Sequence, residues 1–257
     1  MRPTVEPPIR IRGLEYGGQK PLFCIPIVPR DLAELTAQAE VAHSLKPDLV
    51  EFRADFLTNL AVSSLVDAVR LLRSIATDEA IIFTLRAKNE GGAQEVPQYL
   101  RRTLIEAVLR SKTIDIVDLE LANDREFLGS LMPIAKEYGI PVILALHDFE
   151  GTPSNDQLLA KIDAMRLQGA DIAKIAVMPR TADDVLRLFH VTAAARKLYP
   201  HLPLVTMSMG ALGSITRVAG FLYGSDMSFA LGKTGSAPGQ IPIEDARKMS
   251  ALLLRYS

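Results

Sequence analysis

The sequence predicts an α/β fold in the form of one (β/α)8 barrel, a TIM barrel that spans residues 1–257 as a single domain. Three observations lead to this prediction: the length of the chain, the alternation of short apolar segments with helical patterns, and the even spacing of polar residues. A chain of 257 residues suits one barrel of about 250 residues better than two ordinary domains.

Short apolar segments rich in β-branched residues recur along the chain. The expected strands cover residues 22–27, 48–54, 81–86, 114–120, 141–147, 171–177, 203–208 and 226–231. Because the segments are largely apolar throughout, they are typical of parallel strands buried on both faces. A closed eight-stranded barrel is the simplest arrangement, and an open, doubly wound sheet is the alternative.

The segments between the expected strands have apolar residues at helical spacing, most clearly 124–138 and 181–198. Asp31, Ser154 and Thr181 stand where helix N-caps are expected. Polar residues near the strand ends recur every 27 to 34 residues, about one strand–helix unit, at Arg53, Arg86, Glu120, His147, Lys174 and Thr206. Residues 9–20 alternate around a glycine pair and predict a short β-hairpin that closes the barrel floor.

Composition narrows the class of protein. Hydrophobic residues make up 48% and charged residues 23%, an ordinary globular balance, and the formal net charge is -1. With no basic block, we expect neither a nucleic acid nor a membrane surface as partner. The one cysteine, Cys24, and an N-terminus without the apolar core of a secretory signal predict a cytoplasmic protein.

Lys174 is the sharpest chemical signal. It lies inside an apolar expected strand, and lysine is rarely buried without a reason. Burial disfavours the ammonium form, and a neutral amine can attack a carbonyl to form an imine. The alternative is a structural lysine that pairs with a carboxylate or reaches solvent at the rim.

His147 ends the preceding expected strand at the same height. Residues at the carboxyl ends of barrel strands face the active site, where a histidine can take and return a proton near neutral pH. Glu90, in a loop followed by two glycines, could orient this histidine. A structural histidine and a solvated glutamate are the alternatives.

Other charged residues reach the same mouth. Glu51 and Arg53 share one face of their strand, and Arg86 ends the next; they would either hold a small polar ligand or form a buried ion network. Arg217, in the helix after Met207, could bind a carboxylate. Residues 232–240 lack the first glycine of a phosphate-binding P-loop, because Met227 stands there, and predict a mobile loop that closes over a ligand.

Six segments together resemble type I 3-dehydroquinate dehydratase, over nearly the whole chain and in matching order. They are EFRADF (51–56), TLRAKNEGG (84–92), ALHDFEGTP (145–153), IAKIAVMP (172–179), VTMSMG (205–210) and GSAPGQ (235–240). The resemblance implies a (β/α)8 barrel that commonly forms a homodimer and uses no metal or organic cofactor. The first eight residues fall outside it.

The resemblance also implies roles for residues already singled out. Lys174 would form an imine with the 3-keto group of 3-dehydroquinate, and His147 would remove the C2 proton and later protonate the departing C1 hydroxyl. Glu90 would position His147. The implied substrate-binding residues are Arg217 for the carboxylate, Glu51, Arg53 and Arg86 for ring hydroxyls, Met207 and Phe229, and Ser236 and Gln240 from the closing loop.

Two other functions fit parts of the pattern. A class I Schiff-base aldolase would share the lysine, although a phosphate substrate would favour a phosphate site after the last two strands. A barrel without catalytic activity could serve as a binding protein, but it would not need a buried lysine beside a histidine and a glutamate.

Overall fold

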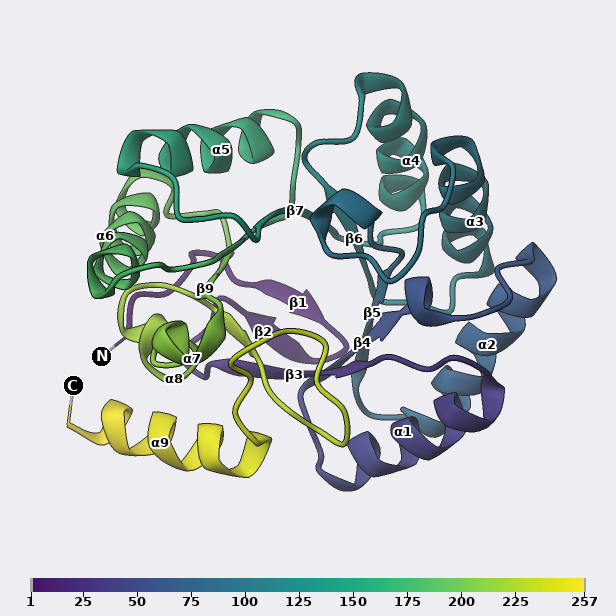
Figure 1. Ribbon diagram of the computed structural model, residues 1–257, viewed down its shortest axis with the longest axis horizontal. Coiled ribbons are helices and arrows are strands. Elements are labelled where there is room, and N and C mark those ends of the chain that lie inside the picture. The colour runs from purple at the N-terminus through teal and green to yellow at the C-terminus, as the bar shows by residue number, and fades with distance from the viewer. Residues whose placement is uncertain (1, 257) are drawn as a thin grey trace.

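The computed structural model describes residues 2–256. It contains eight parallel strands that form a nearly closed barrel, with helices on the outside (Figure 1). The barrel strands are β3 (Leu22–Ile27), β4 (Leu49–Arg53), β5 (Ala80–Thr84), β6 (Ile116–Glu120), β7 (Val142–Asp148), β8 (Ile172–Val177), β9 (Leu204–Ser208) and β10 (Met227–Phe229). Their order, β10-β3-β4-β5-β6-β7-β8-β9, confirms the predicted barrel.

The helices that follow the strands form the outer layer. They are α1 (Leu32–Ser44), α2 (Val62–Ile75), α3 (Gln98–Ser111), α4 (Arg125–Glu137), α5 (Asn155–Leu167), α6 (Ala182–Leu198), α7 (Gly210–Gly213), α8 (Thr216–Ala219) and α9 (Ile243–Arg255). Short 3₁₀ helices η1 (Ala54–Phe56), η2 (Lys88–Glu90) and η3 (Gly220–Leu222) complete the set. Asp31, Ser154 and Thr181 are the N-caps of α1, α5 and α6, as predicted.

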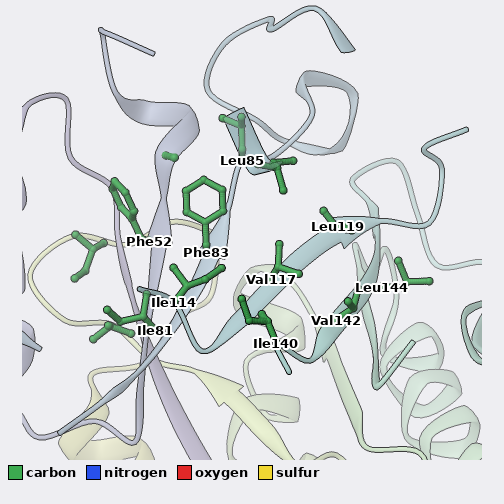
Figure 2. Close-up of a cluster of buried hydrophobic side chains, with 14 of the residues drawn as sticks. Phe52, Ile81, Phe83, Leu85, Ile114, Val117, Leu119, Ile140, Val142 and Leu144 are labelled. Atoms are coloured by element: carbon green, nitrogen blue, oxygen red, sulfur yellow. The ribbon is translucent and has the colours of Figure 1, made fainter. Parts of the chain in front are cut away.

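Two apolar layers hold the barrel together. The outer layer lies between strands and helices, and Figure 2 shows Phe52, Phe83 and Leu144 within it. The inner layer fills the barrel with side chains such as Ile82 and Ile143. Because side chains alternate along each strand, one face of every strand supplies each layer.

The N-terminal hairpin pairs β1 (Ile9–Ile11) with β2 (Leu14–Tyr16) in antiparallel register, as predicted. Its Ile11 and Tyr16 are buried in the inner layer together with Leu22 and Leu49, at the amino ends of their strands. The hairpin therefore covers the barrel floor. Within residues 2–256, no helix is long and apolar enough to cross a membrane.

A buried charge cluster closes the seam between β9 and β10, the two ends of the strand order. The backbone N–H of Asp226 donates to Leu204 O (2.7 Å), and Leu22 N–H donates to Asp226 O (3.0 Å). The Asp226 carboxylate pairs with Arg2 and Arg196 and accepts a hydrogen bond from Leu204 N–H at 2.8 Å. One acid thus connects β9, β10, β3, α6 and the N-terminal segment.

Candidate active site

All eleven site residues predicted from the sequence line one cavity at the carboxyl ends of the strands. They are Glu51, Arg53, Arg86, Glu90, His147, Lys174, Met207, Arg217, Phe229, Ser236 and Gln240. The cavity measures about 40 Å³. Phe149, Ala176 and Met209 also line it and were not among the predicted residues.

Lys174 occupies the middle of β8, where it is 3% exposed. Its Nζ donates to Asp118 Oδ2 at 2.7 Å and lies 3.6 Å from Glu51 Oε1. The Phe229 ring centroid is 4.3 Å away. The predicted burial is correct, but the amine faces the carboxylates of Asp118 and Glu51 rather than apolar groups alone.

Asp118 is a charged residue beside the cavity that sequence reasoning missed. It lies on β6 and is buried, with Arg86 Nη2 at 2.8 Å from its other carboxylate oxygen. Burial acts to raise the pKa of Asp118, but Arg86 and Lys174 outweigh it and hold the pKa below its ordinary value. A signal was available, because period two places Asp118 on the same inward face as Glu120.

His147 and Glu90 form a pair at the edge of the cavity. The Oε2 atom of Glu90 accepts a hydrogen bond from the His147 backbone N–H at 2.9 Å and lies 3.1 Å from Nδ1 of the ring. Burial, followed by the charges of Arg86 and Lys174, lowers the pKa of His147 well below its usual value. The imidazole is therefore neutral at pH 7, and donation from Nδ1 to Glu90 leaves the Nε2 lone pair available as a base.

Glu90 ends η2 and is itself buried. Burial raises its pKa to about 7, although Arg86 acts in the opposite direction. The next residue, Gly91, has φ +85°, and a Cβ there would come within 2.6 Å of the Phe149 ring. Glycine is therefore required at this position, which lets the chain turn back and bring Glu90 against His147.

Arg217 is the most unusual charge in the cavity wall. Its side chain on α8 is 1% exposed, and its guanidinium donates to the carbonyls of Phe229 (3.2 Å) and Pro238 (2.9 Å) and, weakly, to Met207. Among the described residues, no carboxylate pairs with it and its Nε has no hydrogen-bond partner. Burial lowers its pKa to about 10, so it remains a cation at pH 7 and can bind an anion.

The other charges form the buried ion network that was one of the two sequence interpretations. Arg53 donates to both oxygens of Asp55 at 2.8 and 2.7 Å. Arg86 bridges Asp118 and Glu120, at 2.8 and 3.1 Å. Because both arginines also line the cavity, the network and ligand binding are compatible.

The loop 232–240 covers the cavity. No helix begins within this loop, because α9 begins at Ile243. Ser236 N–H donates to Gln240 Oε1 at 2.9 Å, and Gln240 Nε2 donates back to Ser236 Oγ at 3.3 Å. Gly239, with φ +78°, packs against Gly210 so closely that a Cβ would lie 2.2 Å from the Gly210 oxygen. Because no helix follows residues 232–235 directly, this loop is not a P-loop, as the sequence predicts.

No group of three or more His, Cys, Asp or Glu side chains suited to hold a metal occurs within the described part of the chain. The donors at the site are instead one amine, one imidazole, carboxylates and guanidiniums. Such a set suits imine formation and proton transfer on a small anionic carbonyl compound.

Comparison with known proteins gives one family. The model for type I 3-dehydroquinase matches residues 23–256. The 3-dehydroquinate dehydratase of Geobacillus thermodenitrificans is 40% identical over 252 residues, with 97% of each chain covered. That of Aromatoleum aromaticum is 40% identical over 250 residues, with 96% of each covered.

Solved structures agree. The crystal structure of 3-dehydroquinate dehydratase from Geobacillus kaustophilus matches with a TM-score of 0.96 and 40% identity, covering 100% of both chains. The type I enzyme from Clostridium difficile, with covalently modified comenic acid, matches with a TM-score of 0.94 and 30% identity, covering 97% of this chain and 99% of that one.

Proposed function

The chain belongs to the type I 3-dehydroquinase family, and from this premise we propose that it dehydrates 3-dehydroquinate to 3-dehydroshikimate through an imine at Lys174. Family membership makes it a lyase of the shikimate pathway of aromatic amino acid biosynthesis. The observation that carries the imine step is a buried lysine at the cavity wall, next to a neutral histidine held by Glu90.

Substrate binding begins with Arg217. A buried guanidinium that no acid in the described part of the chain neutralises attracts the substrate carboxylate, and the ring hydroxyls then meet Glu51, Arg53 and Arg86. Met207 and Phe229 supply apolar contact to the ring. Ligand pockets usually measure about 300–1,000 Å³, whereas this cavity measures about 40 Å³. The loop with Ser236 and Gln240 must therefore move to admit the substrate and then close over it.

Proton transfer depends on His147. The protonated imine withdraws electrons from C2, so Nε2 of the neutral imidazole can remove a C2 proton and leave an enamine. The imidazolium then protonates the C1 hydroxyl, which departs as water while the iminium re-forms. Glu90 keeps Nδ1 protonated and the ring oriented, so one histidine acts first as base and then as acid.

A direct assay tests the reaction. The product is a conjugated enone, so incubation with 3-dehydroquinate should give a rising ultraviolet absorbance, and Lys174→Met should abolish it. A Schiff-base aldolase would cleave a carbon–carbon bond without making the enone, and a binding barrel would leave the substrate intact. Either of these results would refute the proposed dehydration.

The remaining proposals concern the whole molecule. We expect residues 1–257 to act as one catalytic domain in the cytoplasm, with no metal or organic cofactor and with a small-molecule substrate. We also expect a homodimer, as the family resemblance implies. Sedimentation equilibrium at micromolar concentration would give twice the mass of 28.1 kDa for a dimer, and the single mass would contradict it.

A further inference from the structure

Asp118 is the acid nearest the reactive amine. Its Oδ2 accepts the Lys174 hydrogen bond at 2.7 Å, whereas the Glu51 carboxylate is 3.6 Å from the same nitrogen. Asp118 projects from β6 and Lys174 from β8, two strands apart in the barrel, so both side chains point into the barrel interior. No step of the proposed reaction has yet used this carboxylate.

The charge on the lysine nitrogen is the same before and after imine formation. An ammonium and a ketone give an iminium and water, and the two hydrogens that nitrogen loses depart with the carbonyl oxygen. A fixed anion beside the nitrogen can therefore stabilise both the starting ammonium and the iminium. It does not need to gain or lose a proton.

The surroundings of Asp118 suit that fixed anion. Its side chain is fully buried, and Arg86 Nη2 lies 2.8 Å from the oxygen that does not face Lys174. With the pKa of the carboxyl held below its ordinary value by Arg86 and Lys174 against the effect of burial, it stays ionised at neutral pH. Buried charge pairs interact strongly because little water screens them.

We propose that Asp118 is a further catalytic residue, the permanent counter-ion that stabilises the iminium formed at Lys174. This role rests on the proposed function and adds to it. In the forward step the N–C3 bond forms, the C3–O bond breaks and water leaves, while Asp118 remains a carboxylate throughout. When His147 removes the C2 proton, the nitrogen becomes neutral in the enamine, and the charge returns to it as the C1–O bond breaks.

The counter-ion role predicts two effects of opposite sign for Asp118→Asn. The neutral side chain holds the Lys174 nitrogen less tightly than the carboxylate does at 2.7 Å, so cyanate should carbamylate Lys174 at pH 7 several-fold faster. The free amine loses no such contact, so the iminium becomes less stable relative to it, and kcat and borohydride trapping with 3-dehydroquinate should fall roughly 10- to 100-fold, the usual effect of one charged hydrogen bond. A merely structural role would not raise one rate and lower the other.

Glu120→Gln is the matched control. Glu120 is as deeply buried as Asp118 and also pairs with Arg86, at 3.1 Å, but it does not contact Lys174. If the effects of Asp118→Asn came through release of Arg86, Glu120→Gln would reproduce both of them. We expect it to leave the cyanate rate unchanged.

Glu51→Gln provides a second variant should Asp118→Asn fail to fold. Its carboxylate is farther from Nζ, so carbamylation should rise by a smaller factor than in Asp118→Asn, and no rise would count against the proposal. Unchanged carbamylation and unchanged kcat in folded Asp118→Asn would overturn it outright. If the unaltered protein forms no imine at all, the proposed function fails instead. The cyanate rates still test whether Asp118 is paired with Lys174.

Discussion

The barrel buries charge at both ends, and the two ends differ in how that charge is balanced. At the floor, Arg2 and Arg196 both contact the carboxylate of Asp226, which also fastens the seam between strands. At the mouth, Arg217 has no acid partner among residues 2–256, and His147 is held neutral. Buried charge is costly unless it is paired. The buried ion pairs at the floor are therefore explained by their role in the fold, whereas an unpaired cation beside a cavity is explained by an anionic ligand that pairs with it.

The same contrast separates the expected effects of substitution. Changes at the floor should lower stability and leave the chemistry of folded molecules intact. Changes at the mouth should alter catalysis or binding with a smaller loss of stability.

Among the substitutions that leave Lys174 intact, the largest effect is expected at His147. His147→Ala should still form the imine, because Lys174 is unaltered, but turnover should fall by roughly 10²–10⁴-fold since the base and acid are lost. Steady-state enone formation and borohydride trapping measure the two steps separately. His190→Ala, an exposed histidine, is the control. Wild-type turnover in His147→Ala would remove His147 from the mechanism.

The floor should respond through stability. Asp226→Asn leaves two buried guanidiniums without an anion, which should lower the free energy of unfolding by about 3–5 kcal/mol. Urea denaturation measures the loss, and kcat of the folded fraction at low temperature should stay within twofold. Asp245→Asn, on the exposed side of α9, should change little. A large drop in kcat with normal stability would contradict the division between the two ends.

Glu90 should make stability depend on pH. Its pKa is about 7 in the fold against an ordinary value of 4.5, so the fold favours the protonated form. The contribution of Glu90 to the free energy of unfolding is fully present below about pH 4.5. It is lost as the pH rises through 7, by up to about 3 kcal/mol. Urea unfolding between pH 4.5 and 8 should show a shallower decline in Glu90→Gln than in the unaltered protein. The exposed Glu95→Gln should retain the original slope, and an unchanged slope in Glu90→Gln would exclude a buried, titrating Glu90.

The smallest effect is expected at Arg217. Arg217→Met removes the carboxylate contact, so KM should rise roughly 10- to 100-fold, while the free energy of unfolding changes by about 1 kcal/mol or less because no ion pair is broken. Initial rates over a range of substrate concentrations, with urea unfolding alongside, test both parts. A large loss of stability with normal KM would make Arg217 a structural residue like Arg196.

Much of this arrangement can be predicted from the sequence. Parallel barrel strands are nearly continuous apolar runs, so a polar residue such as Lys174 or His147 stands out, and the even spacing places both at one end of the barrel. The eleven predicted residues do line one cavity. Their roles stay predictions until they are measured.

The missed features depend on contacts between distant parts of the chain. Asp118 and Lys174 are 56 residues apart, and their meeting depends on the stagger of strands around the barrel, which no local pattern encodes. Arg2 and Asp226 are 224 residues apart, and Arg196 has the sequence pattern of an ordinary surface residue in a helix. The sequence therefore suggested a neutral lysine in an apolar pocket, where the structure has a lysine facing two carboxylates.

The central claim is that the amine of Lys174 condenses with the substrate ketone. Borohydride reduction during turnover with 3-dehydroquinate, followed by proteolysis and mass spectrometry, locates the adduct. The account predicts one reduced adduct, on the peptide that carries Lys174, and none in Lys174→Met. Rapid turnover without any adduct on that peptide, or an adduct on a different lysine, would contradict it.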